Sequence, residues 1–504
     1  MIEEQPAQSN LFFKLWPFLA LLLVGIGVPL VMRFLSIKYA IPIIIGLTLA
    51  VMTFVNRDPL RLFLYMLMAI LPIYIAFYLK ELPEYIDHPG LLNYPVIFIY
   101  DVPFWILVIF KLYRAIIHRL DRIEFPKMLI PLLIYFLPAL ISTIDAKVPS
   151  YSYYELMRTA KMIAVTILVA NLIKSRKQLR ICLIIIFIGI FIQDIIGLFQ
   201  YYNPGLSDDV FSSIGIYMGS MNVVPDDPDS AFRVCGTTGY CNALAGYFEL
   251  MLPIALSLLL FIKMRAGVRL SLIVLLILSY IVFYLTYSRG GLIGMGVAMV
   301  IIVIIWFGKL LKKFANFTWV LVISLLLAVL VGYSSYQVVE SRLAETGGLL
   351  EDQVRAALVR TAYNMVNNKP LFGIGLNNFP EMLHKYNPSS IEFEINYPVH
   401  NTYLLITAET GLFGLLFMLW FFWRILVSAY RSSKLEDPEL SAVGFGIFAG
   451  FCGWLTHNFV APLYQNWLVN RLALMILIGI VYILPKLASH EFEQENTSQL
   501  SLPA

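Results

Sequence analysis

The sequence predicts an all-α fold, a polytopic bundle of transmembrane helices with a large, partly helical loop on the extracytoplasmic side. Of its 504 residues 60% are apolar and only 13% are charged, and the mean hydropathy is +0.78. Soluble domains are about 45 to 50% apolar and about 25% charged, so the excess of apolar residues is expected to face lipid. The composition therefore excludes a soluble protein and predicts one that is embedded in a bilayer.

The apolar residues gather into runs of about 17 to 25 residues, the length that crosses a bilayer as a helix, and we expect about twelve to fourteen spans. Arg33 and Lys38 follow the first run in place of the small residues of a cleavage site, so this run is expected to remain as a helix. The predicted spans lie near residues 12–31, 39–55, 60–80, 93–113, 127–144, 154–173, 179–201, 241–262, 269–287, 290–308, 316–336, 401–423, 441–460 and 467–485.

Lys and Arg collect in short loops that fall on one side of the membrane if the spans alternate. Cytoplasmic loops carry such an excess of Lys and Arg, so this side is predicted to be the cytoplasm and to hold both termini. The basic loops are those that begin near Lys111, Lys174, Lys263, Lys309 and Arg424.

The predicted spans divide the chain into six regions. They are an N-terminal transmembrane region (1–200), an extracytoplasmic loop (201–240), a transmembrane region with a Ser-Arg-Gly turn (241–336), a large extracytoplasmic loop (337–399), a C-terminal transmembrane region (400–487) and a disordered cytoplasmic tail (488–504). The large loop carries a helical pattern over residues 351–367. Loops of this length are usually functional.

Charge and cysteine usage narrow the range of partners. The net charge is only +4, and basic clusters between apolar runs are typical of loops at a membrane surface, so no nucleic-acid partner is expected. The four cysteines form neither a CxxC pair nor a Cys/His cluster at metal-ligand spacing, so we expect no metal site and no cofactor. Cys235 and Cys241 lie on the outer side and could form a disulfide if that compartment is oxidising.

Cations on the outer side are informative because the positive-inside bias makes them scarce there. Arg289 lies in the turn Thr286-Tyr-Ser-Arg-Gly-Gly291, which contains no acid and whose glycines allow a ligand to approach the backbone. Arginine offers a planar fork of donors that suits phosphate oxygens. The other outer cations are Arg158, Lys161, Arg233, Arg342, Arg355 and Arg360.

Taken together, these cations predict an anion site at the outer face. Arg158 and Lys161 lie three residues apart and share one helical face. The alternative for any single arginine is an ion pair with a neighbouring acid, such as Glu155 for Arg158 or Glu351 for Arg355.

His400 opens the predicted span near residues 401–423, at the outer interface where water has access. Histidine is the usual general base for a hydroxyl nucleophile, so His400 is the first candidate for this role. The alternative is an interfacial histidine whose hydrogen bonds are satisfied by backbone. His457 and His384 are similar candidates in weaker context.

Four separated stretches, in one order, carry a family pattern. They are Arg233-Val-Cys-Gly-Thr-Thr-Gly-Tyr-Cys-Asn242, then Thr286-Tyr-Ser-Arg-Gly-Gly291, then Arg360-Thr-Ala-Tyr with Asn368-Lys-Pro-Leu-Phe-Gly-Ile-Gly-Leu-Asn-Asn-Phe379, and His400-Asn-Thr-Tyr-Leu-Leu-Ile-Thr-Ala-Glu-Thr-Gly411. With a large outer loop between the third and the fourth, the chain resembles the O-antigen ligase and O-antigen polymerase superfamily of bacterial membrane glycosyltransferases. The resemblance covers residues 230–425.

The resemblance implies an enzyme of the bacterial inner membrane whose site lies on the extracytoplasmic side. Its donor would be a glycan linked to undecaprenyl diphosphate, and its acceptor a hydroxyl of a glycolipid, a glycan or a protein. Arg233, Arg289 and Arg360 would hold the diphosphate and stabilise charge on the leaving group. His400, acting with Arg289 as the catalytic pair, would deprotonate or orient the acceptor hydroxyl, giving transfer with inversion and without a metal ion.

Three further positions are weighed beside the resemblance. Arg158 and Lys161 are expected to add to the diphosphate site. Glu409 fits the family pattern, but nine residues past His400 it lies on the opposite side of a helix, so we expect it to pack or cap rather than to act in chemistry.

Alternatives within and outside this family stay open. A ligase would use lipid A core in lipopolysaccharide biosynthesis, a polymerase would extend an O-antigen or exopolysaccharide repeat, and a protein O-oligosaccharyltransferase would modify serine or threonine. A flippase or transporter of an anionic lipid-linked sugar would favour charges in both halves of the bilayer, whereas here the unusual cations gather on one side. A membrane assembly protein without catalysis would leave the arginines and the histidine unexplained.

Overall fold

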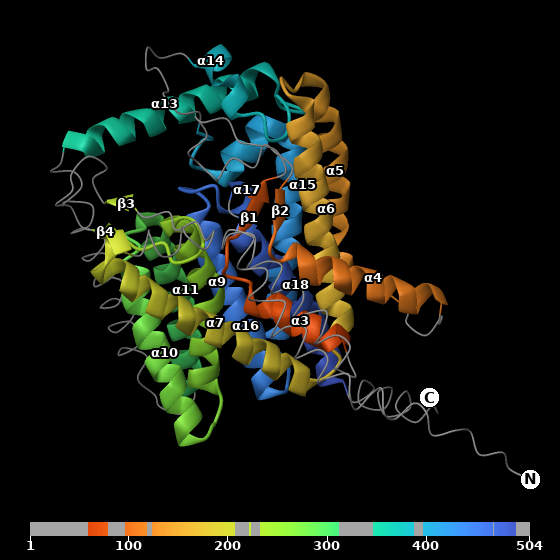
Figure 1. Ribbon diagram of the computed structural model, residues 1–504, viewed down its shortest axis with the longest axis vertical. Coiled ribbons are helices and arrows are strands. Elements are labelled where there is room, and N and C mark those ends of the chain that lie inside the picture. The colour runs from red at the N-terminus through yellow and green to blue at the C-terminus, as the bar shows by residue number, and fades with distance from the viewer. Residues whose placement is uncertain are drawn as a thin grey trace, which may run out of the picture.

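The computed structural model describes residues 59–78, 96–117, 123–206, 221–222, 232–311, 346–387, 397–466 and 468–489. Within these ranges the chain is a bundle of long helices, with one helix, α13 (Thr346–Asn368), lying across one end (Figure 1). The predicted spans near 12–31, 39–55 and 316–336, together with Arg342 and residues 490–504 of the predicted tail, lie outside the described residues.

The all-α prediction is confirmed, and the protein is a multi-pass membrane protein. In the described part of the chain eight helical stretches are long and apolar enough to cross a membrane. They are Lys127–Asp145, formed by η1 (Lys127–Leu129), α5 (Ile130–Ser142) and η2 (Thr143–Asp145), then α7 (Arg176–Tyr202), α9 (Cys241–Phe261), α10 (Ala266–Tyr284), α11 (Arg289–Leu311), α15 (Thr402–Ser432), α16 (Pro438–His457) and α18 (Leu468–Ala488).

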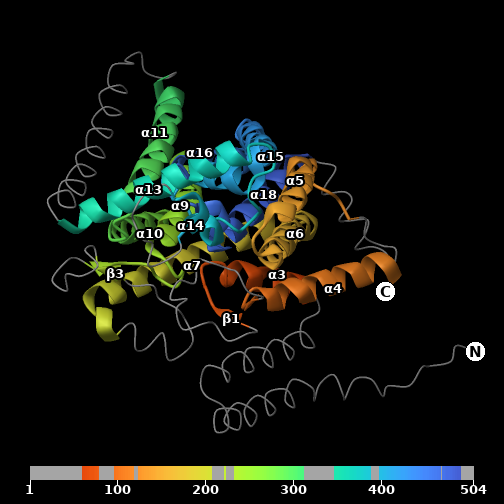
Figure 2. The ribbon, with the colours of Figure 1, turned by 90° about the horizontal axis from the view of Figure 1, so that it is seen from above.

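The helices α9, α16 and α18 form the centre of the bundle (Figure 2). In α18, 89% of the apolar window is buried inside the protein, against 33% in α10 and α15, whose outer faces are therefore left for lipid. Small residues let α16 approach α9 closely, because a side chain on Gly446 would meet the backbone of Ile254. On its other side α18 packs against α6 (Pro149–Leu172), where Thr166 donates a hydrogen bond of 2.8 Å to the Met475 carbonyl oxygen.

Two predicted spans in the N-terminal half are not continuous helices. Helix α3 (Pro59–Ala69) ends three residues before Pro72, which lacks an N–H and disfavours helix in the residue before it. The chain then forms the short antiparallel pair of β1 (Ala76–Tyr78) and β2 (Val96–Phe98), and α4 (Asp101–Ile117) begins only after it.

The predicted outer loop shares a hydrophobic core with the start of α15. Helix α13 covers the predicted helix at 351–367, and the short η3 (Pro380–Met382) and α14 (Leu383–Tyr386) follow it. Leu358 and Met365 of α13 are buried against Phe379 and Leu383 of this segment and against Leu405 of α15. This cluster anchors the loop on the first turns of α15.

A kink in α15 provides a second anchor for the loop. Gly411 interrupts the helix with φ 71° and ψ −173°. The glycine-rich segment after α13 pairs with the interrupted backbone, since the Ile374 N–H donates to the Ala408 carbonyl at 3.0 Å and the Leu412 N–H donates to the Pro370 carbonyl at 2.8 Å. Gly373, with φ 72°, packs directly against the backbone at Glu409.

Candidate functional site

An open pocket of about 220 Å³ lies where the ends of several spans meet α13. Three arginines from separate parts of the chain line it: Arg233 of β4 (Phe232–Arg233), Arg289 at the start of α11, and Arg355 of α13. Its other lining residues are Asn242, Tyr287, Ser288, Gly290, Ile293, His457 and Val460. Three guanidinium groups in one small pocket make it attractive to an anion.

The first turns of two membrane helices add to this attraction. Arg289 is the first residue of α11 and Asn242 the second of α9, and both line the pocket. Helix N-termini carry unsatisfied N–H groups and a partial positive charge. Both features favour phosphate or carboxylate oxygens over cations.

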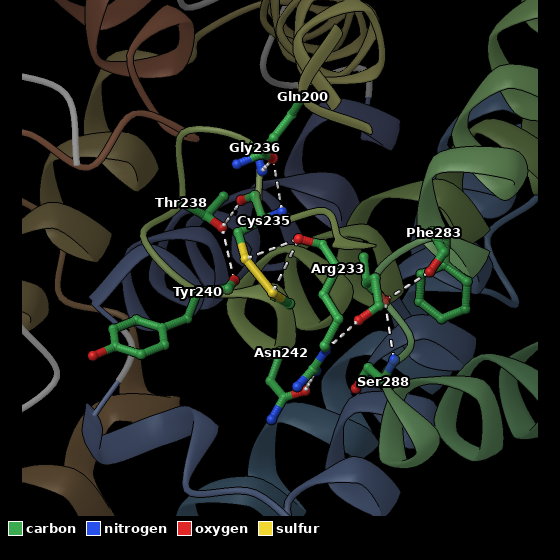
Figure 3. Close-up of a disulfide and its surroundings, with 11 residues drawn as sticks. Gln200, Arg233, Cys235, Gly236, Thr238, Tyr240, Asn242, Phe283 and Ser288 are labelled. Atoms are coloured by element: carbon green, nitrogen blue, oxygen red, sulfur yellow. Dashed lines mark hydrogen bonds between the residues drawn. A yellow bond between two sulfur atoms is a disulfide. The ribbon is translucent and has the colours of Figure 1, made fainter. Parts of the chain in front are cut away.

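Arg233 is held against the turn between α10 and α11. Its Nε donates to the Thr286 carbonyl at 3.0 Å, and its Nη2 donates to Asn242 Oδ1 at 3.2 Å (Figure 3). The Thr286 hydroxyl in turn donates to the Phe283 carbonyl at 2.7 Å. These bonds hold the Arg233 guanidinium at the pocket that Arg289 also lines.

A disulfide joins Cys235 and Cys241 immediately after Arg233 (Figure 3). The loop between the two cysteines is tied to the end of α7, because Gln200 Oε1 accepts from the Cys235 and Gly236 N–H groups, each at 3.0 Å. Strand β4 and the start of α9 are thereby held together, and with them Arg233 and Asn242 at the pocket.

Tyr287 occupies a strained position in the same turn, with φ 48°, a value that a residue other than glycine seldom adopts. Burial raises the pKa of Tyr287 above its ordinary value, and the neighbouring Tyr201 and Tyr284 add to the shift. The phenol is therefore a hydrogen-bond donor at any physiological pH, at the edge of the arginine pocket.

Arg289 has neither an ion pair nor a hydrogen bond to another side chain within the ranges that the structure describes. An arginine that lines a pocket without an acid to neutralise it leaves its five N–H donors for a ligand. Arg158, in contrast, forms an ion pair with Glu155.

Behind the arginines, α16 brings a histidine and α9 an acid into contact. His457 Nδ1 lies 3.1 Å from both carboxyl oxygens of Glu249, and Nε2 lies 3.3 Å from Ser288 Oγ. Ser288 Oγ also accepts from the Gly291 N–H at 3.2 Å. Glu249 and His457 are both fully buried, yet the imidazole reaches the pocket wall.

Two glycines of α11 leave room for this pair. A side chain on Gly290 would place its Cβ 2.5 Å from His457 Cδ2, and one on Gly294 would come within 2.6 Å of Glu249 Oε1. Since Gly290 and Gly294 lie four residues apart, they share one face of α11. This face is the wall against which the imidazole and the carboxyl group pack.

Part of the pocket lies in a segment that matches a known protein family. Residues 273–419 match the O-antigen ligase family. The O-antigen ligase domain thus runs from α10 through the Arg289 turn and α13 to the middle of α15, whereas Arg233, Glu249 and His457 lie outside it. A search of curated proteins found no match to the chain.

The structure places the residues that sequence reasoning proposed for the site in different surroundings. Arg233 and Arg289 come together at the pocket. Arg360 lies on an exposed face of α13, and five residues separate it from Arg355, so the two point in directions about 140° apart. Arg355, not Arg360, is the residue of this helix that lines the pocket.

His400 does not line the arginine pocket, but its segment is joined to the histidine that does. The Thr402 N–H donates to the Asn458 carbonyl at 2.9 Å, and the Thr402 hydroxyl donates to Asn458 Oδ1 at 2.6 Å. Asn458 follows His457 directly, so the start of α15 in the O-antigen ligase domain is bound to the end of α16. His400 itself lies beside the Tyr397 ring, with ring centroids 6.5 Å apart.

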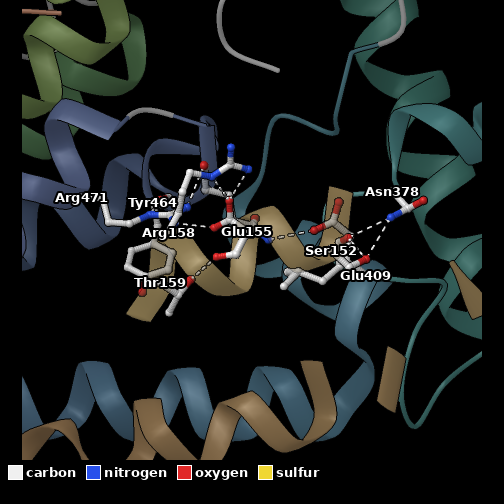
Figure 4. A network of polar contacts seen from close by, with 10 residues as sticks. Ser152, Glu155, Arg158, Thr159, Asn378, Glu409, Tyr464 and Arg471 are labelled. Carbon is white, nitrogen blue, oxygen red and sulfur yellow. Dashed lines mark hydrogen bonds and ion pairs between the residues drawn. The ribbon is translucent and has the colours of Figure 1, made fainter. Parts of the chain in front are cut away.

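Arg158 and Lys161 engage acids at a separate place. Arg158 Nη2 lies 2.8 Å from Glu155 Oε2, and Arg471 of α18 forms a second ion pair with the same carboxylate (Figure 4). Lys161 Nζ lies 2.6 Å from Asp101 Oδ1. The geometry therefore corresponds to the alternative in which these cations pair with neighbouring acids, and their contribution to a diphosphate site stays a prediction.

Glu409 makes capping contacts in the structure, and the expectation that it takes no part in chemistry stays a prediction. It is buried in α15, where Oε1 accepts from the Phe379 N–H and Oε2 accepts from Gln465 Nε2, each at 3.2 Å. It caps backbone of the outer loop, next to the Asn378 and Ser152 network in Figure 4.

Sequence reasoning missed Glu249, Ser288 and the position of Arg355. Glu249 had a detectable signal, because an acid in the middle of an apolar run is costly at membrane depth and tends to mark a site. Arg355 had no sequence signal beyond its charge, because the orientation of α13 decides which arginine of that helix faces the bundle. Among the described residues no group of three or more His, Cys, Asp or Glu side chains is arranged to hold a metal ion.

Proposed function

We propose that this protein is a membrane glycosyltransferase of the O-antigen ligase type. It transfers a glycan from undecaprenyl diphosphate to an acceptor hydroxyl on the extracytoplasmic face of the bacterial inner membrane. The O-antigen ligase family implies an enzyme with glycan substrates.

One observation carries the proposal: Arg233, Arg289 and Arg355 line a single pocket at the ends of membrane helices. A lipid-linked diphosphate matches this position, because its polyprenyl chain stays in the bilayer while its two phosphates lie at the interface. Guanidinium groups bind phosphate oxygens in pairs, and a pocket of about 220 Å³ holds a group of this size.

In the proposed reaction the acceptor oxygen forms a bond to the glycosidic carbon while the bond from that carbon to the diphosphate oxygen breaks. His400 takes the proton of the acceptor hydroxyl, and the diphosphate leaves with the bonding electron pair. The arginines stabilise the negative charge that develops on the leaving group. Attack from the side opposite the diphosphate inverts the configuration at the glycosidic carbon.

The placement of His400 supports separate roles for the histidine, as base for the acceptor, and for the arginines, as ligands of the diphosphate. It lies outside the arginine pocket but on the segment that is hydrogen-bonded to the end of α16 beside it. A base for the acceptor is needed on the far side of the sugar from the diphosphate. A separation between His400 and the arginines is therefore what an inverting displacement requires.

The acceptor distinguishes ligase, polymerase and protein glycosyltransferase, all of which would share this pocket. The transporter alternative is less well supported, because charged groups would then be expected along both halves of a path through the bilayer. Here the pocket-lining cations gather at one end of the helices.

The proposal is tested by transfer from undecaprenyl-diphosphate-linked oligosaccharide to lipid A core, to a second lipid-linked repeat and to a serine-containing pilin peptide. Purified full-length protein in detergent is compared with His400→Ala and Arg289→Ala, and product is read by mass spectrometry. We expect transfer by the wild type, with and without a chelator, and its loss in both folded variants. Unchanged transfer in the variants would reject the site, and movement of the lipid across liposomes without any transfer would favour the transporter.

A further inference from the structure

We propose that Ser288 is a further ligand of the donor diphosphate, and that His457 and Glu249 are positioning residues that direct its hydroxyl proton into the pocket. This inference rests on the proposed function and adds a neutral donor to the arginine pocket. It assigns a role to a buried acid and a buried histidine that the proposed reaction does not use.

The three side chains form a continuous chain of contacts. Glu249 lies 3.1 Å from His457 Nδ1, and His457 Nε2 lies 3.3 Å from Ser288 Oγ. Ser288 and His457 both line the pocket, whereas Glu249 is completely buried behind them. Contact therefore runs from the interior of α9 to the pocket wall.

The hydrogen-bonding capacity of the serine limits how protons are arranged. A hydroxyl has one proton and accepts two hydrogen bonds. One acceptor position of Ser288 Oγ is taken by the Gly291 N–H at 3.2 Å. If His457 Nε2 carries a proton and donates to the second position, neither His457 nor Glu249 can accept the serine proton, which is then directed toward the pocket that Ser288 lines.

The opposite arrangement would have Ser288 donate to Nε2 while Nδ1–H donates to a Glu249 carboxylate. The Glu249–His457 pair would then carry a net charge of about −1 in a water-excluded site directly behind the pocket, which would repel a bound anion. With a proton on Nε2 and a second proton shared between Nδ1 and the carboxyl group, the pair is neutral overall. A bound diphosphate selects this second arrangement.

The packing around His457 and Glu249 depends on two glycines of α11. Gly290 and Gly294 leave space on α11 that any larger residue would take from the imidazole or the carboxyl group. Ser288 lies next to Arg289, so a hydroxyl directed into the pocket and the guanidinium beside it meet the same phosphate. The turn thus offers a charged donor and a neutral donor from consecutive residues.

The test measures the affinity of the purified full-length protein, in dodecyl maltoside micelles, for undecaprenyl diphosphate and for undecaprenyl monophosphate. We compare the wild type with Ser288→Ala, His457→Phe, their double variant, Glu249→Gln and Glu249→Leu. Ser257→Ala is the matched control, because Ser257 is an equally buried serine of α9 whose hydroxyl donates to the Ala442 carbonyl at 2.7 Å, away from the pocket. The melting temperature of each variant reports whether it is folded.

We expect Ser288→Ala and His457→Phe each to weaken diphosphate binding about tenfold, the size of one hydrogen bond to a charged group. The double variant should lose no more than either single variant, because the histidine acts through the serine. Monophosphate binding should fall less than diphosphate binding. Glu249→Gln should keep most of the affinity, since an amide can donate to Nδ1 and leave the proton on Nε2, whereas Glu249→Leu should lose it.

Three results would overturn the inference. The first is a folded Ser288→Ala variant that binds undecaprenyl diphosphate with wild-type affinity. The second is a loss of affinity in the double variant equal to the sum of the two single losses. The third is a loss in Glu249→Gln as large as in His457→Phe, which would mean that the carboxylate charge itself is required. Arg289→Ala separates this failure from that of the proposed function. If the wild type binds the diphosphate and Arg289→Ala does not, the arginine pocket stands even when the serine plays no part, and if the wild type does not bind it, the proposed function fails first.

Discussion

At the scale of residues, the pocket is defined by which arginine side chains reach it. Arg355 and Arg360 belong to one helix, yet only Arg355 lines the pocket. We expect Arg355→Ala to weaken binding of undecaprenyl diphosphate about tenfold and Arg360→Ala to weaken it about twofold or less. Titration of both purified variants with the lipid checks this, and a larger loss in Arg360→Ala would favour the assignment that the family resemblance implies.

Arg289 offers a test of geometry as opposed to charge. Lysine in its place would keep the positive charge but lose the planar fork that binds two phosphate oxygens at once. Arg289→Lys should therefore retain binding of the donor while transfer falls about tenfold or more, because the leaving group is less well held as its charge grows. Separate measurement of kcat and KM distinguishes Arg289→Lys from Arg289→Ala, in which kcat should fall and KM should rise. An effect of Arg289→Lys that is confined to KM would argue against this prediction.

The sequence indicated which cations are candidates for the site, but it did not indicate which of them form ion pairs with distant acids. Arg233 and Arg289 were recognisable as cations on the predicted outer side, and the turn that holds Arg289 contains no acid. Arg158 and Lys161 looked similar in sequence, but Lys161 pairs with Asp101, sixty residues away along the chain. Only the packing of α4 against α6 brings that acid into reach, so no local pattern could have indicated it.

At the scale of elements, the start of α11 depends on glycine for space as well as for conformation. Gly290→Ala should displace the His457 ring, which would lie 2.5 Å from the new Cβ. We expect transfer activity to fall about tenfold, with a melting temperature lowered by only a few degrees. Gly267→Ala is the matched control, because a Cβ at that position of α10 meets nothing within 4 Å, and it should leave both quantities nearly unchanged.

The kink of α15 has a different physical basis. Gly411 has φ 71° and faces the backbone at Leu371, so alanine there would be strained and would also push away the loop segment that follows α13. Gly411→Ala should cost about 2 kcal/mol or more. Thermal unfolding in detergent measures this, with Gly205→Ala as the control at a position with no neighbour within 4 Å, and equal melting temperatures would contradict the assignment.

Hydropathy located most of the membrane helices but could not reveal this kink. The stretch Gly373-Ile-Gly-Leu-Asn-Asn378 contributes backbone partners to the interrupted α15. Likewise, residues 60–80 have the composition of a span, but Pro72 and the pairing of β1 with β2 divide them. Such choices depend on neighbours that are distant in sequence.

At the scale of the whole molecule, basic residues gather at the end of the bundle opposite the pocket. Helices α7, α10 and α16 begin there, and α9 and α15 end there, with Arg176, Arg180, Lys263, Arg265 and Lys434 around them. The positive-inside bias therefore predicts that this end lies in the cytoplasm and that the pocket lies outside.

Labelling with a membrane-impermeant maleimide tests this orientation. A cysteine introduced at Lys385 of α14 should react in intact spheroplasts, and one introduced at Lys263 between α9 and α10 should react only after permeabilisation. The background thiols Cys182 and Cys452 are first replaced by serine, and the Cys235–Cys241 disulfide is left intact. The reverse pattern would place the pocket in the cytoplasm and reject the proposed donor.

The pocket combines membrane helices with α13, which lies across the end of the bundle and contributes Arg355. A diphosphate bound by all three arginines would therefore hold α13 against the bundle. Binding of the donor would then determine the position of α13 when the acceptor binds. We expect the kinetics to be compulsory-ordered, with the lipid-linked donor adding first. Initial rates at varied concentrations of both substrates, with an acceptor analogue that lacks the reacting hydroxyl as a dead-end inhibitor, should show inhibition that is competitive toward the acceptor and uncompetitive toward the donor.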